Sequence, residues 1–490
     1  MRITFARLLA AAVLLLAQSA WSKAPNIVYI LADDLDAATA AEMPEVRSLI
    51  AEQGASFQQH MVSLSLCCPS RISALRGQFA HNTGIFTNSR KTGGGFVYIH
   101  KLGLEASTAA TWLQAAGYRT AMFGKYFNEY PDKAPSKLYI PPGWSEWLSP
   151  IEGTPYKGFD YVVNDNGSRH SHGAEPGDYL TDVLSKRATR FIRESIANQP
   201  EQPFFLYLST YAPHSPATPA PRHAALFSEL DAPQMSSFNE EDVSDKPAWV
   251  RDKPRLDRTL IKKINELYRN RRRSLLAVDE MVRAVMDTLQ SQGVLQDTYV
   301  IFTSDNGFHQ GQHRLDSGKD TAYEEDLLVP LWIRGPGVAA GRQVDLLTAN
   351  VDVAPTLADL AGATMPDFVD GRSLRPLLSG TPPSWRQALL LEHKGVDATV
   401  VRRVDGPWEP LDGVPPGIKP FSGLRLADRT TYVAYDHGEF EFYDNLLDPL
   451  QESNRYAQTD ATTRARLAAW LASLRQAGGA ALRQAELAPP

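Results

Sequence analysis

Three short apolar runs in the sequence each end in a cluster of polar residues, and this pattern restricts the fold more than any other feature. The runs are Asn26–Leu31 (NIVYIL), Phe204–Tyr211 (FFLYLSTY) and Thr298–Thr303 (TYVIFT). Continuous apolar runs rich in β-branched and aromatic residues are typical of strands that are buried on both faces, as in parallel sheets. Arg273–Gln292 has helical periodicity, and Gly293 ends that helix. We therefore expect an α/β fold built on a large, mainly parallel sheet flanked by helices.

The same kind of pattern predicts the elements around these strands. Pro44–Gln53 and a segment from the N-cap Ser107 to Ala116 are expected to be helical. Tyr130–Asp165 is rich in proline, glycine and aromatic residues, and we expect long loops over the sheet edge there. The basic run Arg269–Arg273 is interpreted as a solvated helix face, because it has no interleaved aromatic residues.

The pattern changes after Ser379–Ser384 (SGTPPS), which has the composition of a turn-rich linker. Beyond it the sequence predicts short strands and a final helix, namely Thr399–Arg402, Thr431–Ala434, Glu439–Tyr443 and the helix Thr462–Ala477. We expect a main domain over residues 23–382 and a small α+β subdomain with an antiparallel sheet over residues 383–490.

The N-terminus has the features of an export signal. Arg2 and Arg7 give a positively charged start. The apolar stretch that follows, Leu8–Ala17, is too short to span a bilayer. Small residues follow, so residues 1–22 are interpreted as a signal peptide, with a buried N-terminal helix or an uncleaved anchor as the alternatives. No later stretch is long and apolar enough for a membrane span. We expect an exported protein that is periplasmic or secreted, or lysosomal in a eukaryote.

Charge and cysteine usage narrow the range of functions. The chain has 50 Lys and Arg against 56 Asp and Glu, a net charge of −6, which argues against nucleic acid as a partner. Its two cysteines, Cys67 and Cys68, are adjacent. Neighbouring residues do not easily reach disulfide geometry. We therefore expect at least one of them to take part in chemistry.

Oxygen-bearing side chains follow two of the predicted strands. Asp33 and Asp34 come after the first, and Asp305 and Asn306 come after the third. Ligands bind at the carboxyl ends of strands in open α/β sheets, so these residues are expected to meet. Carboxylate and amide oxygens suit Ca²⁺ or Mg²⁺ better than zinc. Taken alone, each pair has a turn or a helix cap as its alternative explanation.

One motif connects these features to a known family. Cys67-Cys68-Pro69-Ser70-Arg71, followed by Leu75-Arg76-Gly77, has the form C-x-P-S-R-x-x-x-L-x-G. It resembles the sulfatase signature, in which the first cysteine is oxidised to formylglycine. The Asp-Asp and S-D-N-G strand ends strengthen the resemblance. It extends from about Asn26 to Asn454, including the pattern Tyr443-Asp444 … Asp448-Pro449 … Glu452-Ser453-Asn454 that often closes such chains. It implies the alkaline-phosphatase-like fold, with residues 23–382 as a sulfatase catalytic domain that hydrolyses sulfate monoesters.

The resemblance also implies roles for individual residues. It implies a divalent cation, usually Ca²⁺ with Mg²⁺ as the alternative, held by Asp33, Asp34, Cys67, Asp305 and Asn306. It implies a catalytic set of Cys67, Arg71, Lys125, His214 and Lys319. In that set Arg71 stabilises the hydrated formylglycine, Lys125 and Lys319 bind sulfate, and His214 protonates the leaving oxygen. A formylglycine-generating enzyme is the implied partner during maturation.

Two positions depart from the family pattern. Phe127 stands where many sulfatases have a histidine that assists release of sulfate. Asn128, His309 and His172 are the alternative candidates for that role. Arg76 stands where Thr or Ser is usual, a change that affects recognition by the maturation enzyme and not the reacting atoms.

The substrate is suggested by likeness to one subgroup. The blocks around Cys67, Lys125 and His214 resemble N-acetylglucosamine-6-sulfatases and extracellular heparan 6-O-sulfatases. This implies a sugar 6-O-sulfate, such as N-acetylglucosamine-6-sulfate or a glycosaminoglycan unit. Two alternatives stay open: a phosphoester or phosphonate-ester hydrolase of the same superfamily, and a non-catalytic protein that binds sulfated glycans with Cys67 unconverted.

Overall fold

The computed structural model describes residues 24–380, 384–395 and 418–490. The expected signal peptide, residues 1–22, the strand expected at Thr399–Arg402 and the centre of the expected linker lie outside the described residues.

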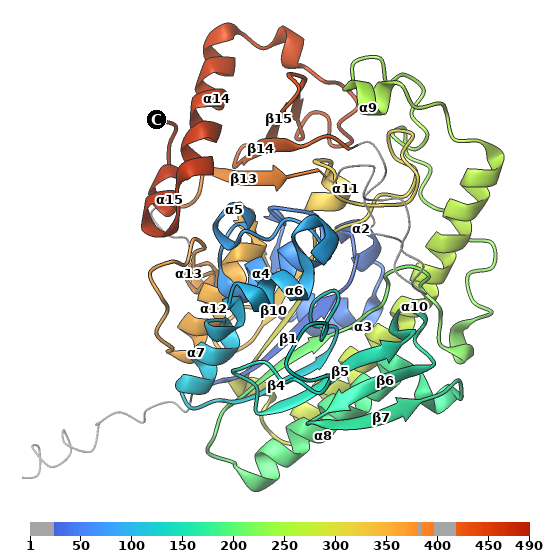
Figure 1. Cartoon of the computed structure of the whole chain (residues 1–490), viewed down its shortest axis with the longest axis vertical. Coiled ribbons are helices and arrows are strands. Elements are labelled where there is room, and N and C mark those ends of the chain that lie inside the picture. Colours follow the sequence, from blue (N-terminus) through green and yellow to red (C-terminus); the bar gives the residue numbers. More distant parts are fainter. Residues whose placement is uncertain (1–23, 381–383, 396–417) are drawn as a thin grey trace, which may run out of the picture.

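A ten-stranded mixed sheet forms the centre of the molecule (Figure 1). Its strands, in spatial order, are β11 (Arg342–Val344), β2 (Ala55–Phe57), β10 (Leu331–Arg334), β9 (Thr298–Ser304), β1 (Asn26–Ala32), β8 (Phe204–Ser209), β4 (Arg119–Gly124), β5 (Glu146–Gly153), β6 (Tyr161–Asp165) and β7 (Ser168–His172). The three strands predicted from apolar runs, β1, β8 and β9, are parallel neighbours at its middle. Two further strands, β3 (His60–Met61) and β12 (Thr348–Ala349), form a separate two-stranded parallel sheet.

The segment expected to form loops over the sheet edge instead extends the sheet. Within Tyr130–Asp165, β5 pairs in parallel with β4, and β6 pairs antiparallel with β5. The aromatic residues that suggested loops are core residues here, since Trp147 is fully buried. Pro150 lies at a register shift between β5 and β6, where a strand tolerates proline. The loop prediction is therefore wrong for residues 146–153 and 161–165.

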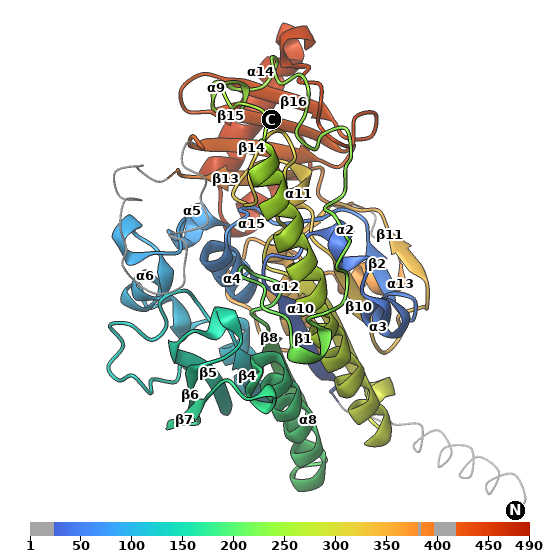
Figure 2. The ribbon, with the colours of Figure 1, turned by 90° about the vertical axis from the view of Figure 1, so that its right-hand side faces the viewer.

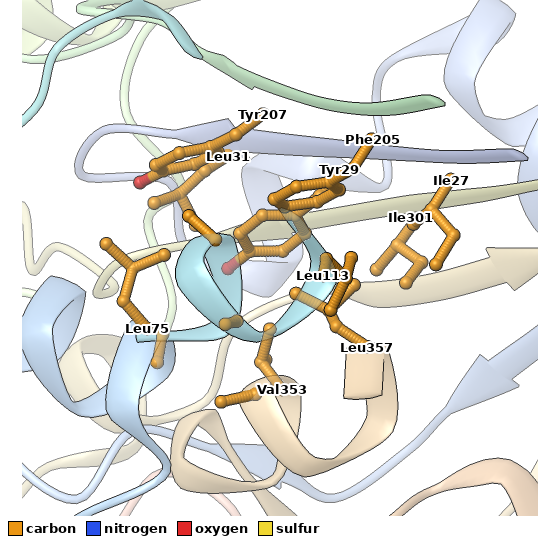
Figure 3. Packing of buried hydrophobic residues seen from close by; sticks show 14 of the residues in the cluster. Ile27, Tyr29, Leu31, Leu75, Leu113, Phe205, Tyr207, Ile301, Val353 and Leu357 are labelled. Atoms are coloured by element: carbon orange, nitrogen blue, oxygen red, sulfur yellow. The ribbon is translucent and has the colours of Figure 1, made fainter. Parts of the chain in front are cut away.

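Side chains alternate between two helical layers, as expected for a buried sheet. Ile27 and Tyr29 of β1 pack with α4 (Cys67–Arg76), α7 (Ala109–Ala115) and α12 (Val353–Ala361), as Figure 3 shows. In that layer the Tyr29 and Tyr207 rings stack with centroids 5.2 Å apart. Val28 of β1 faces the other layer, formed by α8 (Leu180–Asn198) and α10 (Arg258–Ser291), which lie side by side in Figure 2.

The predicted helices are present with shifted ends. The first is divided into α3 (Pro44–Val46) and a π-helical turn, Arg47–Ala51. The N-cap of α7 is Thr108 instead of Ser107. The remaining short helices are α2 (Ala37–Ala40), α5 (Ala80–Thr83), α6 (Gly95–Lys101), α9 (Ala248–Arg251), α11 (Glu324–Leu327) and α13 (Arg375–Ser379). No described helix combines the length and the apolar character that a membrane span requires.

Helix α10 begins well before the predicted start. Its N-cap is Asp257, whose side chain accepts hydrogen bonds from the backbone amides of Thr259 and Leu260. The basic run therefore lies inside the helix. Arg271 is fully buried, in phase with the buried Leu275. The expectation of a solvated face is wrong for this residue.

The C-terminal part forms a separate four-stranded antiparallel sheet, drawn in orange and red at the top of Figure 1. Its strands are β13 (Ala388–His393), β14 (Phe421–Leu426), β15 (Thr430–Tyr435) and β16 (Phe440–Asp444), and its helices are α14 (Ala461–Gln476) and α15 (Gly479–Ala485). Leu467 and Leu471 of α14 pack with β13 and β14. The predicted fold class, a mainly parallel sheet with flanking helices and a second antiparallel sheet, is confirmed. The boundary at residue 382 stays a prediction.

Candidate active site

The carboxyl ends of the neighbouring strands β1 and β9 bring four of the predicted metal ligands together. The Asp34 amide donates a hydrogen bond to Asp305 Oδ1 at 3.0 Å. Asn306 Nδ2 donates to Asp34 Oδ1 at 2.8 Å. The four residues predicted after the strands, Asp33, Asp34, Asp305 and Asn306, are all buried. Their convergence follows from the parallel pairing of neighbouring strands.

Cys67 is the first residue of α4 and faces this group of oxygens. Its Sγ lies 3.4 Å from Asp33 Oδ1 and 3.8 Å from Asp34 Oδ1. The next backbone amide, that of Cys68, donates to Asn88 Oδ1 at 2.8 Å and so satisfies a free donor at the helix start. Burial raises the pKa of the Cys67 thiol well above its ordinary value, although Lys125 and Lys319 act in the opposite direction.

Arg71 lies one helical turn after Cys67 and connects the strand ends. Its Nε donates to Asp305 Oδ2 at 2.8 Å, and its Nη1 donates to Ser209 Oγ at 2.7 Å. Its Nη2 lies 3.7 Å from Asp33 Oδ1. Residues four apart share a helix face, so Cys67 and Arg71 point toward the same cluster. The guanidinium group is fully buried and holds β1, β8 and β9 at a fixed spacing.

Both predicted lysines enter the cluster as buried ammonium groups. Lys125, at the end of β4, donates to Asp33 Oδ2 at 2.7 Å. Lys319 Nζ lies 2.6 Å from Cys67 Sγ and donates to Asp34 Oδ1. Burial alone would lower the pKa of each lysine, but the facing carboxylates raise it above its usual range. Both side chains therefore stay charged.

His214 follows β8, and its ring lies beside Asp34. Its Nδ1 donates to the carbonyl of Ser215 at 2.7 Å, which leaves the lone pair of the neutral ring on Nε2. Nε2 lies 3.6 Å from Asp34 Oδ2. Burial lowers the pKa of His214 to about 4, partly offset by Asp34. The imidazole is therefore neutral at pH 7 in this arrangement.

The residues present fit a divalent cation. The side-chain oxygen Oδ1 of Asn306 is buried and has no hydrogen-bond partner among the described residues, so it is available as a ligand. One ligand atom from each of Asp33, Asp34, Cys67 and His214 lies within 4.8 Å of the others. Oxygen donors of this kind suit Ca²⁺ or Mg²⁺. Among Asp33, Asp34, Cys67 and His214, only His214 was not predicted from the sequence as a metal ligand.

The three candidates for the residue that replaces the usual histidine lie in different places. His172 lies on β7, where it contacts Asp178 and stacks on Tyr161. This edge strand is five strand spacings, about 24 Å, from β1, so His172 does not join the cluster. Asn128 is buried three residues after Lys125.

His309 belongs to the segment that follows Asn306. Its Nδ1 pairs with Asp326 Oδ1 at 2.9 Å, and its Nε2 is buried without a hydrogen-bond partner in the described chain. Its backbone pairs with Gly318, next to Lys319. The structure therefore places the backbone of His309 beside the segment that carries Lys319.

The segment Gly318–Leu327, here called the lysine loop, is held by the C-terminal sheet. Asp320 Oδ1 pairs with His393 Nδ1 of β13 at 2.9 Å. Tyr323 donates its hydroxyl to Glu441 of β16 at 2.9 Å. Glu324 pairs with Arg425 of β14. Three strands of the second sheet therefore fix the loop that carries Lys319.

Sequence reasoning missed three residues that contact the cluster. Ser209, the last residue of β8, contacts Arg71, and its position at a strand end is a signal that the sequence does contain. Tyr156 comes from the turn between β5 and β6. The centroid of its ring lies 4.9 Å from Lys125 Nζ and 4.5 Å from the centroid of the His214 ring. Arg271 donates to the Asp34 carbonyl at 2.6 Å. No sequence pattern indicated the last two.

Comparisons with known proteins agree with this geometry. A model of the sulfatase family matches residues 25–363. The chain is 35% identical over 384 residues to the human N-acetylglucosamine-6-sulfatase. The alignment covers 77% of this chain and 68% of that protein. It is 35% identical over 385 residues to the extracellular sulfatase SULF-1 homolog of Drosophila melanogaster, covering 77% of this chain. The chain spans only 34% of the length of that fly protein.

A solved structure supports the fold. It is described as BT4656 in complex with its substrate D-glucosamine-2-N,6-O-disulfate, and it superposes with a TM-score of 0.74 at 24% identity. The superposition covers 92% of this chain and 97% of the other. The expected alkaline-phosphatase-like fold is thereby confirmed. With the family match over 339 residues, from 25 to 363, the chain belongs to the sulfatase family.

Proposed function

We propose that this protein hydrolyses sulfate monoesters at the cluster around Cys67, after conversion of Cys67 to formylglycine by a formylglycine-generating enzyme. The observation that carries the proposal is the composition of the cluster. In the described part of the chain, three buried carboxylates and three buried cationic side chains surround one cysteine that opens a helix. These charges are balanced, so an added divalent cation leaves an excess of positive charge that suits an anionic ester.

A hydrated formylglycine at position 67 would supply the attacking hydroxyl, and a divalent cation held by Asp33, Asp34, Asp305 and Asn306 would neutralise charge on the sulfate oxygens. Lys125 and Lys319 keep their charges in the buried site and can donate hydrogen bonds to the sulfate group. Arg71 holds Asp305 in place. Because these donors are already ordered, they need little rearrangement when charge develops.

His214 is suited to proton transfer at its Nε2 atom. Its Nδ1 is engaged with the Ser215 carbonyl, so Nε2 is the atom at which a proton is held or released. The ring packs against Tyr156 at 4.5 Å, which fixes its orientation. We assign to His214 the protonation of the leaving oxygen. Because Nε2 carries no proton in this arrangement, the ring must first take up a proton there, which the charge of an anionic ester would favour.

The release of sulfate would need a proton acceptor for the second hydroxyl of the hydrated formylglycine. We favour His309 for this step, since Asp326 holds its Nδ1 and leaves its buried Nε2 open. Carboxylate-oriented histidines of this kind are common bases in enzymes.

For the substrate we propose a sugar 6-O-sulfate such as N-acetylglucosamine-6-sulfate. Support comes from the human relative, which is named for that activity, and from the neighbouring structure, whose ligand carries a 6-O-sulfate. Export fits this proposal, because one relative is named an extracellular sulfatase. Calcium is proposed as the ion, with Mg²⁺ as the alternative.

The test uses full-length protein produced in a host that makes formylglycine. Mass spectrometry of the peptide that contains Cys67 is expected to show an aldehyde in place of the thiol, and sulfate release from N-acetylglucosamine-6-sulfate is expected to exceed that from an aryl sulfate. Cys67→Ser should abolish turnover, whereas Cys68→Ala, the matched control, should retain it. An intact thiol with no turnover would favour a glycan-binding protein, and faster cleavage of a phosphonate monoester would favour the other hydrolase class.

A further inference from the structure

Arg271 is a buried arginine of α10 that contacts the proposed cation site from outside the predicted catalytic set. Its Nη2 donates to the backbone carbonyl of Asp34 at 2.6 Å and lies 3.3 Å from Asp36 Oδ2. Its Nη1 approaches the carbonyl of Pro213 at 3.4 Å. Its guanidinium carbon lies 4.3 Å above the ring of Phe308.

These contacts belong to three segments that follow three different strands. Asp34 follows β1, Pro213 follows β8 and precedes His214, and Phe308 follows β9 two residues after Asn306. A single side chain from the helical layer thus contacts the segments that carry four predicted cation ligands and the predicted proton donor. Arg71 makes the corresponding connection from the opposite layer.

The backbone of Asp34 gives this contact its significance. Asp34 has φ of 62°, in the left-handed region that non-glycine residues adopt only at a cost in conformational energy. Such a conformation persists only where the surroundings fix it. On the carbonyl side of Asp34 the fixing contact is Arg271, and on the amide side it is Asp305 Oδ1.

Stability alone does not account for an arginine at this position. Burying a guanidinium group is costly, and the carboxylate that pairs with it among the described residues, Asp36, lies 3.3 Å away. The attachment of α10 to the sheet is already provided by apolar residues further along the same helix, including Val278, Val282 and Val285. An apolar side chain would fill the space at less cost.

We propose that Arg271 is a positioning residue of the active site. It keeps Asp34 in its left-handed conformation and holds the segment before His214 at a fixed distance. The Asp34 carboxylate, the His214 imidazole and the bound cation are thereby aligned. This inference rests on the proposed function, which supplies the cation and the reaction.

The experiment compares Arg271→Met and Arg271→Lys with the wild type and with Arg272→Met. Arg272 is the matched control, because it lies on the same helix and pairs with Glu42 at 3.3 Å, away from the cluster. Two quantities are measured on full-length protein: the Ca²⁺ dissociation constant by calorimetry after chelator treatment, and kcat and KM on N-acetylglucosamine-6-sulfate. The melting temperature in chelator reports on folding.

We expect Arg271→Met to weaken Ca²⁺ binding at least tenfold and to lower kcat more than it raises KM. Arg271→Lys, which keeps one donor for the Asp34 carbonyl, should recover part of both, and Arg272→Met should change neither. A lower melting temperature with unchanged Ca²⁺ affinity and kcat would overturn the positioning role. If Arg271→Met does not fold, Arg271→Lys decides by the same criteria. A wild type that neither binds Ca²⁺ nor cleaves the ester would instead refute the proposed function.

Discussion

Lys319 and Cys67 are 252 residues apart in the chain, yet the ammonium nitrogen lies 2.6 Å from the sulfur. Cys67 begins helix α4, which packs on the ten-stranded sheet. Lys319 lies in the lysine loop, which the four-stranded sheet holds in place. The close approach places a permanent positive charge at the atom that the proposed modification alters. The lysine is therefore expected to act on the reacting group directly.

Replacing Lys319 should test this expectation. Loss of one charged donor from a preorganised site typically lowers kcat by about 10² to 10³. We expect Lys319→Met to lower kcat/KM on N-acetylglucosamine-6-sulfate by about that factor. The melting temperature should also fall, because the variant leaves the buried Asp34 carboxylate without this ammonium partner. Lys262→Met, on the exposed side of α10, is the control and should match the wild type. A Lys319→Met enzyme with full activity would contradict the role.

Removal of the cation should reduce both activity and stability. The Asn306 side-chain oxygen is buried and has no hydrogen-bond partner among the described residues, and three carboxylates lie beside it. We expect a chelator to abolish ester hydrolysis and to lower the melting temperature, and added Ca²⁺ to restore both. Asn306→Ala should require more Ca²⁺ for half-maximal recovery. Unaltered activity after exhaustive chelation would rule out a cation in the reaction.

A buried ion-pair network around Arg386 joins the main domain to the C-terminal segment. We expect it to contribute strongly to the free energy of unfolding. Arg386 contacts Asp352 at 2.6 and 2.8 Å and Glu486 of the C-terminal segment at 2.8 Å. Removing one partner of a buried pair costs about 3–5 kcal/mol, because the remaining charges are left unpaired. We expect Arg386→Met to lower the free energy of unfolding in urea by that amount.

The control for this prediction is an exposed pair of the same type. Arg375 pairs with Asp359 at 3.0 Å near the surface. Arg375→Met should cost no more than about 1 kcal/mol, as is usual for exposed pairs. Equal losses in the two variants would show that burial does not decide the strength of the network.

His60 predicts a pH dependence of stability. It is fully buried beside Thr348, and burial lowers its pKa from 6.5 to about 4. The unfolded chain therefore binds a proton between these values that the folded chain does not, so stability falls as the pH decreases through this window. At pH 4 the loss from this group is about 3 kcal/mol relative to pH 7.

The measurement is urea unfolding at pH 7 and at pH 4 for the wild type and for His60→Gln, whose side chain does not titrate. The difference in stability between the two pH values should be about 3 kcal/mol smaller in the variant. Identical pH dependence in the two proteins would mean that His60 keeps an ordinary pKa in the folded state.

Much of the site was predictable because it depends on local patterns. Asp33 and Asp305 come directly after apolar strands, and parallel pairing of those strands brings them together. Cys67 and Arg71 are four residues apart on one helix. In each case the position in a regular element determines where the side chain points.

The rest depends on contacts between distant segments. Arg271 lies in a basic run that reads as a solvated surface, and only the full length of α10 reveals its inward phase. Trp147 lies in a segment whose aromatic residues suggested loops, but these residues form core strands. The contact of Asp320 with His393 has no sequence signal, since the second sheet must first be placed against the lysine loop.

The lysine loop has a consequence for how such chains diverge. The region that defines the family ends at residue 363, whereas His393, Arg425 and Glu441, which hold the loop, all lie beyond it. A chain that exchanged its C-terminal portion for an unrelated one would keep every residue of the proposed active site. It would lose the contacts that hold the lysine loop, and with them the position of Lys319. The two portions are therefore expected to be inherited together, even though the family model covers only the first.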